Sequence, residues 1–274
     1  MSLSIGLDIG GSTTKVMGLL DGKFHGSWLG KADDAEASAY GALFKYLSIH
    51  SLAPQDIEQI AVTGVGNNAL QDNFIHSPIK RVDEFEAVGR GGLFLTGLKE
   101  AVVVSLGTGT AFVYANGAGS RHLIGSGVGG GTLLGLARAL FGTRDFDAID
   151  RLAEAGDMRK VDLAIRDIAL NDITGLASDV TASNFGKLQN DSEKEDLAAG
   201  LVNMIYQTVG IIATLCARNC GVDDVVWVGQ ASELATGRDV LNSVSKLYGM
   251  NFHMPEMAPY ATACGAALLG HQND

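Results

Sequence analysis

Two short runs rich in glycine and threonine, about a hundred residues apart, constrain this chain most. The first spans residues 8–15 and the second residues 105–111. Each run joins two apolar stretches typical of strands. Glycine lets the backbone of such a turn approach an anion closely, and its N–H groups can then donate to a phosphate. The repeated strand–turn–strand unit predicts a duplicated fold that holds a nucleotide between its two halves.

Apolar periodicity predicts the remaining elements. In the first half, Asp33 is expected to cap a helix that ends near residue 50, and a second helix ends near residue 98. Strands followed by helices in both halves predict an α/β fold, with one domain at residues 1–98 and another at 99–274. The other predicted strands are 4–7, 15–20, 24–29, 57–63, 101–106, 111–114 and 225–228, and the later helices are 196–219, 235–247 and 260–269.

The composition limits the partners of the chain. Its 20 basic and 31 acidic residues give a net charge of −11, which argues against a nucleic-acid surface. A phosphate ligand would therefore depend on backbone N–H groups, a metal and a few cations. Cys216, Cys220 and Cys264 form no disulfide framework. We expect no apolar run of membrane-spanning length and no leader segment, hence a cytoplasmic protein without a membrane partner.

The first run carries two charged residues that the second lacks. Asp8 ends a predicted strand, where its carboxylate could hold Mg²⁺ or simply cap the turn. Lys15 could place a positive charge near a phosphate or could be a solvated strand residue. The second run has Ser105 in place of Asp8, so the duplication predicts one metal-binding carboxylate.

Residues 8–15, 106–110 and 225–229 resemble the two phosphate motifs and the adenosine motif of the superfamily of acetate and sugar kinases, heat-shock cognate proteins and actin. Within it, residues 82–87, 129–136 and 179–186 resemble those of type II pantothenate kinases. The resemblance covers essentially the whole chain. It implies duplicated actin-like (ribonuclease H-like) domains with a nucleotide cleft between them. It also implies a cytoplasmic homodimer that uses ATP and Mg²⁺ to convert pantothenate to 4′-phosphopantothenate, the first step of coenzyme A biosynthesis.

The resemblance also implies roles for single residues. Glu84 would be the general base that takes the proton of the pantothenate hydroxyl, although an acidic helix N-terminus explains the same run. The family has an arginine where this chain has His122, with Arg121 one residue earlier, so both are candidates for the substrate site, together with Asn184. The residues implied in binding ATP are Asp8, which would also hold the metal, Ile9, Gly10, Gly11, Ser12, Thr13, Thr14, Lys15, Thr108, Gly130, Gly131, Thr132, Leu133, Leu134, Phe146 and Gln230.

Three alternatives belong to the same superfamily. The first is a kinase for an N-acetylhexosamine or another sugar, which usually has an aspartate base in a different motif. The second is an ATPase that activates a dehydratase through an iron–sulfur cluster, for which Cys216 and Cys220 are poorly spaced. The third is a non-enzymatic, actin-like nucleotide-binding protein. The presence of Glu84 as a candidate general base, together with both turns, argues against a non-enzymatic protein.

Overall fold

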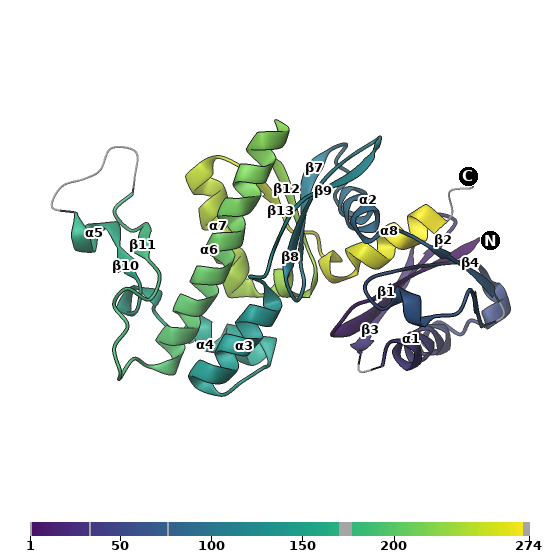
Figure 1. Ribbon diagram of the computed structural model, residues 1–274, viewed down its shortest axis with the longest axis horizontal. Helices are drawn as coiled ribbons and strands as arrows, with labels where there is room; N and C mark the ends of the chain where they lie inside the picture. The colour runs from purple at the N-terminus through teal and green to yellow at the C-terminus, as the bar shows by residue number, and fades with distance from the viewer. Residues whose placement is uncertain (1, 33, 76, 170–176, 271–274) are drawn as a thin grey trace.

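The computed structural model contains two large sheets with helices α2 (Glu84–Thr96) and α8 (Ala261–Gly270) between them (Figure 1). It describes residues 2–32, 34–75, 77–169 and 177–270. Within these residues the first sheet has the strand order β3–β2–β1–β4–β6–β5. Its strands are β1 (Leu3–Ile9), β2 (Thr13–Leu20), β3 (Lys23–Lys31), β4 (Ile57–Thr63), β5 (Asn73–Phe74) and β6 (Ser77–Arg81).

The second sheet has the order β13–β12–β7–β8–β9 in the described part of the chain. Both sheets begin with an antiparallel hairpin, β1–β2 and β7–β8, and each hairpin contains one of the two glycine/threonine turns. The strands of the second sheet are β7 (Ala101–Leu106), β8 (Thr110–Asn116), β9 (Gly119–Ser126), β12 (Asp224–Val228) and β13 (Asn251–His253).

The two faces of β1 differ in what they pack against. Its odd-numbered residues are buried aliphatics in one core with helix α1 (Ala35–Ile49). Its other face meets α8, where a Cβ atom on Gly6 would lie 1.8 Å from the carbonyl oxygen of Ala263. This alternation follows from the two-residue period of a strand. It places Asp8, also at an even position, on the α8 face of the sheet.

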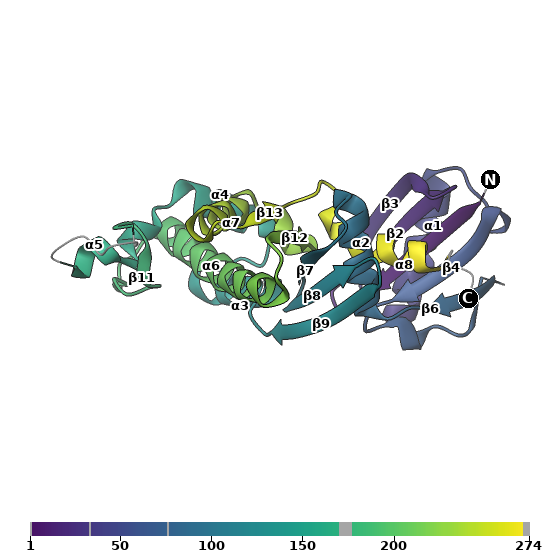
Figure 2. The ribbon, with the colours of Figure 1, turned by 90° about the horizontal axis from the view of Figure 1, so that it is seen from above.

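Each half of the chain ends in a helix that packs on the sheet of the other half. Helix α2 contacts β7, β8, β9 and β12, whereas α8 contacts β1, β2 and β4. The two helices also cross with their backbones in contact: a Cβ atom on Gly91 would lie 1.8 Å from the oxygen of Ala261, and one on Gly265 would lie 1.8 Å from that of Ala87. Both views show the two helices between the sheets (Figures 1 and 2). The helices therefore link the two halves by packing.

Helices α6 (Lys194–Cys220) and α7 (Ala235–Tyr248) pack on the outer side of the second sheet, and α3 (Gly130–Phe141) and α4 (Phe146–Ala155) pack against α6. The core beneath them contains the fully buried rings of Trp227 and Tyr206. Among the described helices, α6 alone is long and apolar enough to cross a membrane, which corrects the expectation that no run reaches this length. Because 56% of its most apolar window is buried inside the protein, α6 is a core helix.

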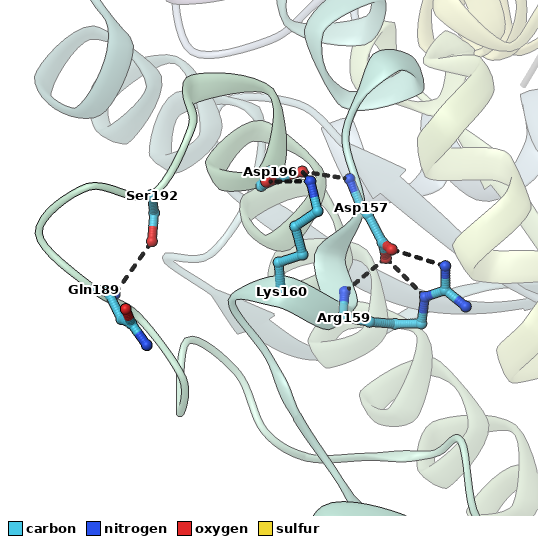
Figure 3. Close-up of polar contacts among 6 residues, drawn as sticks. All are labelled: Asp157, Arg159, Lys160, Gln189, Ser192 and Asp196. Atoms are coloured by element: carbon cyan, nitrogen blue, oxygen red, sulfur yellow. Dashed lines mark hydrogen bonds and ion pairs between the residues drawn. The ribbon is translucent and has the colours of Figure 1, made fainter.

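A small projection extends from the N-terminal end of α6, at the far end of the molecule from the first sheet (Figure 2). It contains β10 (Leu163–Ala164), α5 (Ile165–Ile168) and β11 (Thr181–Ser183). Its base is anchored by the buried carboxylate of Asp196, which accepts hydrogen bonds from the Asp157 N–H at 2.8 Å and the Lys160 ammonium at 3.0 Å (Figure 3). Asp157 in turn pairs with Arg159.

The predicted elements agree with the observed ones to within a few residues at most ends. The helix predicted from 196 to 219 spans 194–220, and the last helix spans 261–270. The cap of α1 differs from the prediction: Asp34 caps it, accepting from the Ala37 N–H at 2.7 Å, and Asp33 lies outside the described residues. Asp34 has the usual geometry of an N-cap residue, because its carboxylate accepts from the N–H of the residue three positions further on.

Candidate functional site

The two glycine/threonine turns face each other from the two halves. The Gly10 N–H donates to the Thr13 carbonyl at 3.0 Å, and the Gly107 N–H donates to the Gly109 carbonyl at 3.0 Å. The exposed hydroxyls of Ser12 and Thr108 lie 3.4 Å apart. The side chains of the two turns thus meet across the gap between the halves, where the predicted nucleotide phosphates would have to lie.

The N-terminus of α3 supports the second turn. The N–H groups of Gly130 and Gly131 donate to the carbonyls of Gly107 and Thr108, both at 2.8 Å. These two N–H groups are therefore already used within the protein, and the turn is held in place by them. The Thr132 hydroxyl donates to the Gly127 carbonyl at 2.8 Å, which closes the loop before the helix. Of the other residues predicted here, Leu133 is fully buried in the core and Leu134 packs beside it.

Replacing Gly131 with Ala is expected to weaken ATP binding. The new Cβ atom would lie 2.9 Å from the Thr108 carbonyl oxygen, which is backbone and cannot move without displacing the second turn. Overpacking of this kind costs about 1–3 kcal/mol, so we expect the Kd for ATP to rise about tenfold or more. Isothermal titration calorimetry measures this. Gly135→Ala is the matched control, because no atom lies within 4 Å of its Cβ position. Equal affinities of the two variants would remove the second turn from the site.

Phe146 and Ala231, the residue after Gln230, meet the N-terminal end of α3. The Phe146 ring comes within 3.3 Å of the position that a Cβ atom on Gly130 would take, and so does the Ala231 side chain. Gln230 follows Gly229, whose φ of +94° turns the chain away from β12. The Gln230 Oε1 atom is buried and has no hydrogen-bond partner among the described residues. A buried acceptor without a partner suits a ligand that brings a donor.

Asp8 and Lys15 form a shielded ion pair at the start of the first turn. They are opposite each other on β1 and β2, and the Lys15 ammonium lies 3.2 Å from the Asp8 Oδ2 atom. The Lys15 side chain is only 12% exposed and that of Asp8 only 8%, so Lys15 is not a solvated strand residue. Gly64, with a φ of +88°, comes so close that a Cβ atom there would lie 2.8 Å from the Asp8 Oδ1 atom.

This environment suits a magnesium ion better than an all-protein metal cage. The described residues contain no group of three or more His, Cys, Asp or Glu side chains that could hold a metal. Mg²⁺ typically takes one or two carboxylates, substrate phosphates and several waters. Asp8, as a single carboxylate beside the glycine/threonine turns, fits that ligand set.

Glu84 is the first residue of α2. Asp83 caps the helix, accepting from the N–H groups of Phe85 at 2.9 Å and Glu86 at 3.0 Å. Partial burial raises the pKa of Glu84, the negative charges of Asp8 and Asp83 raise it further, and Lys15 acts in the opposite direction. Glu84 is therefore within electrostatic reach of Asp8 and Lys15, and its carboxylate holds a proton more tightly than an ordinary glutamate does.

The next two residues of α2 bind strand β9. The Glu86 Oε1 atom accepts from the Ser120 N–H at 2.9 Å. The Phe85 ring stacks on the His122 ring, with centroids 4.2 Å apart and planes at 26°. His122 therefore contacts Phe85, the residue that follows Glu84 in the chain. These contacts fix the start of α2 on the edge of the second sheet.

Arg121 lies on the other face of β9. It pairs with Tyr114 in register, and its guanidinium lies 6.0 Å from the Tyr114 ring centroid and 4.0 Å from the Cys220 sulfur at the end of α6. A register shift between Phe112 and Val113 sets which of the two adjacent residues faces α2. The structure thus brings His122, and not Arg121, to the neighbourhood of Glu84.

Asn184 lies on the projection, directly after β11, and both views show β11 far from the hairpins β1–β2 and β7–β8 that contain the two turns (Figures 1 and 2). Its amide donates to the buried Asp162 carboxylate at 3.4 Å. The same carboxylate accepts from the Phe185 N–H at 2.7 Å and the Asn203 amide at 2.7 Å. Within a single chain Asn184 therefore holds the projection together and does not meet Glu84.

Sequence reasoning missed the residues that support Asp8 from β4. Thr63 is its neighbour in parallel register, is fully buried, and has a hydroxyl without a hydrogen-bond partner among the described residues. Gly64 follows it with the positive φ already noted. The available signal was the position of this pair at the carboxyl end of a buried strand, where ligands of α/β sheets commonly bind.

A family model described as Fumble matches residues 100–236. A type II pantothenate kinase of Staphylococcus aureus is 26% identical over 280 residues, which cover 98% of this chain and 100% of the relative.

Solved structures resemble the whole chain in fold. The activator of the 2-hydroxyisocaproyl-CoA dehydratase from Clostridium difficile with bound ADPNP is 19% identical, with a TM-score of 0.70 over 98% of this chain and 94% of that one. A ROK family glucokinase from Streptomyces griseus in complex with glucose and AMPPNP is 14% identical, with a TM-score of 0.65 over 99% and 100% of the two chains. These likenesses confirm the predicted duplicated, actin-like α/β fold.

Proposed function

This chain belongs to the Fumble family, and we propose that it transfers the γ-phosphoryl group of ATP to pantothenate, forming 4′-phosphopantothenate. The observation that carries the catalytic part of this proposal is that Glu84, at the start of α2, lies within electrostatic reach of the Asp8–Lys15 pair at the first turn. The choice of pantothenate rests on the similarity to type II pantothenate kinases over 98% of the chain.

In the proposed reaction, the primary hydroxyl oxygen of pantothenate forms a bond to the γ-phosphorus of ATP. The bond from that phosphorus to the bridging oxygen breaks, and ADP leaves. The carboxylate of Glu84 accepts the proton of the attacking hydroxyl, which its raised pKa favours. Phosphoryl transfer depends mainly on positioning and on charge stabilisation. The two turns would position the phosphates, and Lys15 would offset their charge.

Mg²⁺, held at Asp8, would neutralise negative charge on the phosphate oxygens. Phe146, Gln230 and the start of α3 would surround the adenine, whose amino group is the kind of donor that the unpartnered Gln230 Oε1 atom requires. His122, held by Phe85, is the proposed substrate contact on β9.

We also propose that the protein is a homodimer formed through α6. Its least-buried side carries apolar residues, among them Leu215, which is 61% exposed. Exposed apolar side chains of Ile124, Leu136 and Leu140 belong to the neighbouring β9 and α3. Large exposed apolar side chains are common at interfaces between subunits. In such a dimer the projection of a second subunit could bring its Asn184 to the substrate, as the family resemblance implies.

Replacing Leu215 with Glu is expected to convert the dimer to a monomer, because a charged side chain would be buried without a partner. Size-exclusion chromatography with light scattering gives the mass directly. Ile49→Glu is the matched control: Ile49 is 53% exposed, at the end of α1 in the other half of the chain, and its replacement should leave the mass unchanged. A dimer that persists in Leu215→Glu would exclude this face as the interface.

The pH dependence of the reaction should reflect the raised pKa of Glu84. The folded protein favours the protonated carboxyl. The base form of Glu84 therefore appears at a higher pH than that of an ordinary glutamate, whose pKa is about 4.3. We expect kcat/KM to fall as the pH drops through this raised pKa, while the fold persists by circular dichroism. An acid limb at the pKa of an unperturbed glutamate would contradict the assignment.

The assay for the proposed function measures ADP release with ATP and Mg²⁺ and a panel of acceptors: pantothenate, N-acetylglucosamine and glucose. The hexoses are included because a glucokinase shares the fold. We expect release that depends on pantothenate. Release that depends on a sugar instead, or on no acceptor, would overturn the proposal.

A further inference from the structure

A groove lies at the opposite end of β8 from the second turn. Its walls are the C-terminal half of α2, the chain just after it, the β8–β9 connection at Asn116 and Gly117, and the end of α8. It encloses about 560 Å³ and adjoins a second hollow of about 220 Å³, with Arg90 lining both. Pockets of roughly 300–1,000 Å³ are typical of small-molecule sites.

The groove is well separated from the proposed nucleotide site. Strand β8 runs from Thr110, beside the second turn, to Asn116 at the groove. At about 3.4 Å per residue this is about 20 Å. The groove also lies along α2 away from Glu84: Phe94, which lines it, is ten residues further on, or about 15 Å along the helix. A ligand here need not compete with ATP.

Two cations in the groove have no carboxylate partner. Arg90 and Lys99 form no ion pair with any of the residues that the structure describes. Glu86 lines the adjoining hollow, but its carboxylate already accepts the Ser120 N–H. With Glu86 counted, the groove and the adjoining hollow carry two cations and one carboxylate, a local excess of positive charge in a chain with 31 acidic and 20 basic residues.

The rest of the lining is largely apolar. Leu93, Phe94, Leu98 and Leu268 contribute to the groove, and the Phe94 side chain is 43% exposed. The polar amide of Asn116 is already engaged, with its oxygen accepting from the Ala118 N–H at 2.9 Å and its nitrogen donating to Tyr114 at 3.3 Å. The groove therefore offers positive charge together with apolar surface, and little unused neutral polarity.

We propose that this groove binds an amphipathic anion, with its acidic headgroup on Arg90 and Lys99 and its aliphatic tail along Leu93, Phe94, Leu98 and Leu268. A carboxylate or a phosphate monoester provides the headgroup, because both accept charge-assisted hydrogen bonds from guanidinium and ammonium groups. The tail removes apolar surface from water.

A simpler function for Lys99 accounts for only part of this arrangement. Helix α2 ends at Thr96, and a cation beyond a helix C-terminus offsets the negative end of its dipole. Arg90, however, lies in the middle of α2, where the dipole gives a cation no such advantage. Arg90 is half-buried and lines the groove, and a dipole effect does not explain this position.

Isothermal titration calorimetry with octanoate tests the proposal. We expect octanoate and octyl phosphate to bind, and octanol and acetate, which supply the tail or the headgroup alone, to bind at least about tenfold more weakly. Comparing octanoate with octyl phosphate distinguishes the two headgroups. Absence of octanoate binding, or octanol binding as tight as octanoate binding, would overturn the proposal.

Two further measurements locate the site. The double variant Arg90→Met, Lys99→Met keeps the aliphatic stems and should lower octanoate affinity about tenfold or more. Lys246→Met, an exposed lysine on α7, is the matched control and should bind as the unmodified chain does. Saturating ATP and Mg²⁺ should change the octanoate Kd less than threefold. Competition with ATP, or full affinity in the double variant, would show that octanoate binds elsewhere and would overturn the assignment.

Discussion

Replacing Glu84 with Gln is expected to lower kcat by about 10² or more, with little change in the Kd for ATP. The amide keeps the size of the side chain but cannot accept the proton of an attacking hydroxyl. The hydrogen bonds of the two glycine/threonine turns and the Asp8–Lys15 ion pair do not involve Glu84. Steady-state rates and calorimetric ATP binding measure the two effects separately. Turnover within a few fold of the unmodified chain would remove Glu84 from the role of base.

Glu86→Gln is the matched control for this variant. Glu86 is two residues away, and its Oε1 atom accepts the Ser120 N–H, which a glutamine oxygen can also do. Turnover of Glu86→Gln should therefore stay within a few fold of normal. A similar loss in both variants would indicate that the start of α2, and not the Glu84 carboxylate, is what the reaction requires.

The same Glu84→Gln variant should be at least as stable as the unmodified chain at neutral pH. The pKa of Glu84 is raised in the folded protein, so the folded state binds this proton more tightly than the unfolded state. Its contribution to the unfolding free energy therefore falls as the pH rises from the ordinary pKa through the raised one. The amide does not ionise and removes this cost. Thermal unfolding at pH 7 measures it, and a lower Tm would contradict the raised pKa.

Replacing Asp8 with Asn is also expected to reduce turnover strongly. We expect kcat to fall by about 10² or more at ordinary Mg²⁺ concentrations, because the proposed metal-binding carboxylate is lost and Lys15 loses its ion-pair partner. The concentration of Mg²⁺ needed for half-maximal activity should rise. Rates over a Mg²⁺ series measure both quantities, and a normal kcat at low Mg²⁺ would exclude Asp8 from binding the metal.

The pH profile of the Asp8→Asn variant tests whether the charge of Asp8 acts on Glu84. Because the charge of Asp8 raises the pKa of Glu84, its removal should lower that pKa, and the acid limb of the residual activity should move to lower pH. Asp34→Asn is the matched control, since Asn caps a helix about as well as Asp and this residue is exposed at the start of α1. An unmoved acid limb in Asp8→Asn would show that the two carboxylates are not coupled.

Local patterns predicted the hairpins and helices well, because they depend on periodicity and turn residues. The packing of α2 and α8 on each other's sheets was beyond such patterns. Gly91 and Gly265 allow the backbones of these helices to touch, but nothing local distinguishes them from glycines that meet no atom at all, such as Gly135. The contact depends on residues about 170 positions apart, Gly91 with Ala261 and Ala87 with Gly265.

In the candidate site, too, some features follow from local sequence patterns and others depend on contacts between distant parts of the chain. The two turns and Asp8 follow from the local motif, whereas the choice between Arg121 and His122 depends on a register shift in β8–β9 that only the paired strands reveal. Likewise, Gly130 and Gly131 belong to a glycine run typical of phosphate binding, yet their N–H groups hold the second turn.

Product analysis tests the central claim most directly. The unmodified chain is incubated with pantothenate, Mg²⁺ and ATP labelled with ¹⁸O in the γ-phosphoryl group, and the products are identified by mass spectrometry and phosphorus NMR. The account predicts one phosphorylated product, labelled pantothenate with its phosphate on the primary hydroxyl, formed in step with ADP and greatly reduced in Glu84→Gln. Labelled inorganic phosphate as the sole product, or pantothenate recovered unchanged beside ADP, would contradict it.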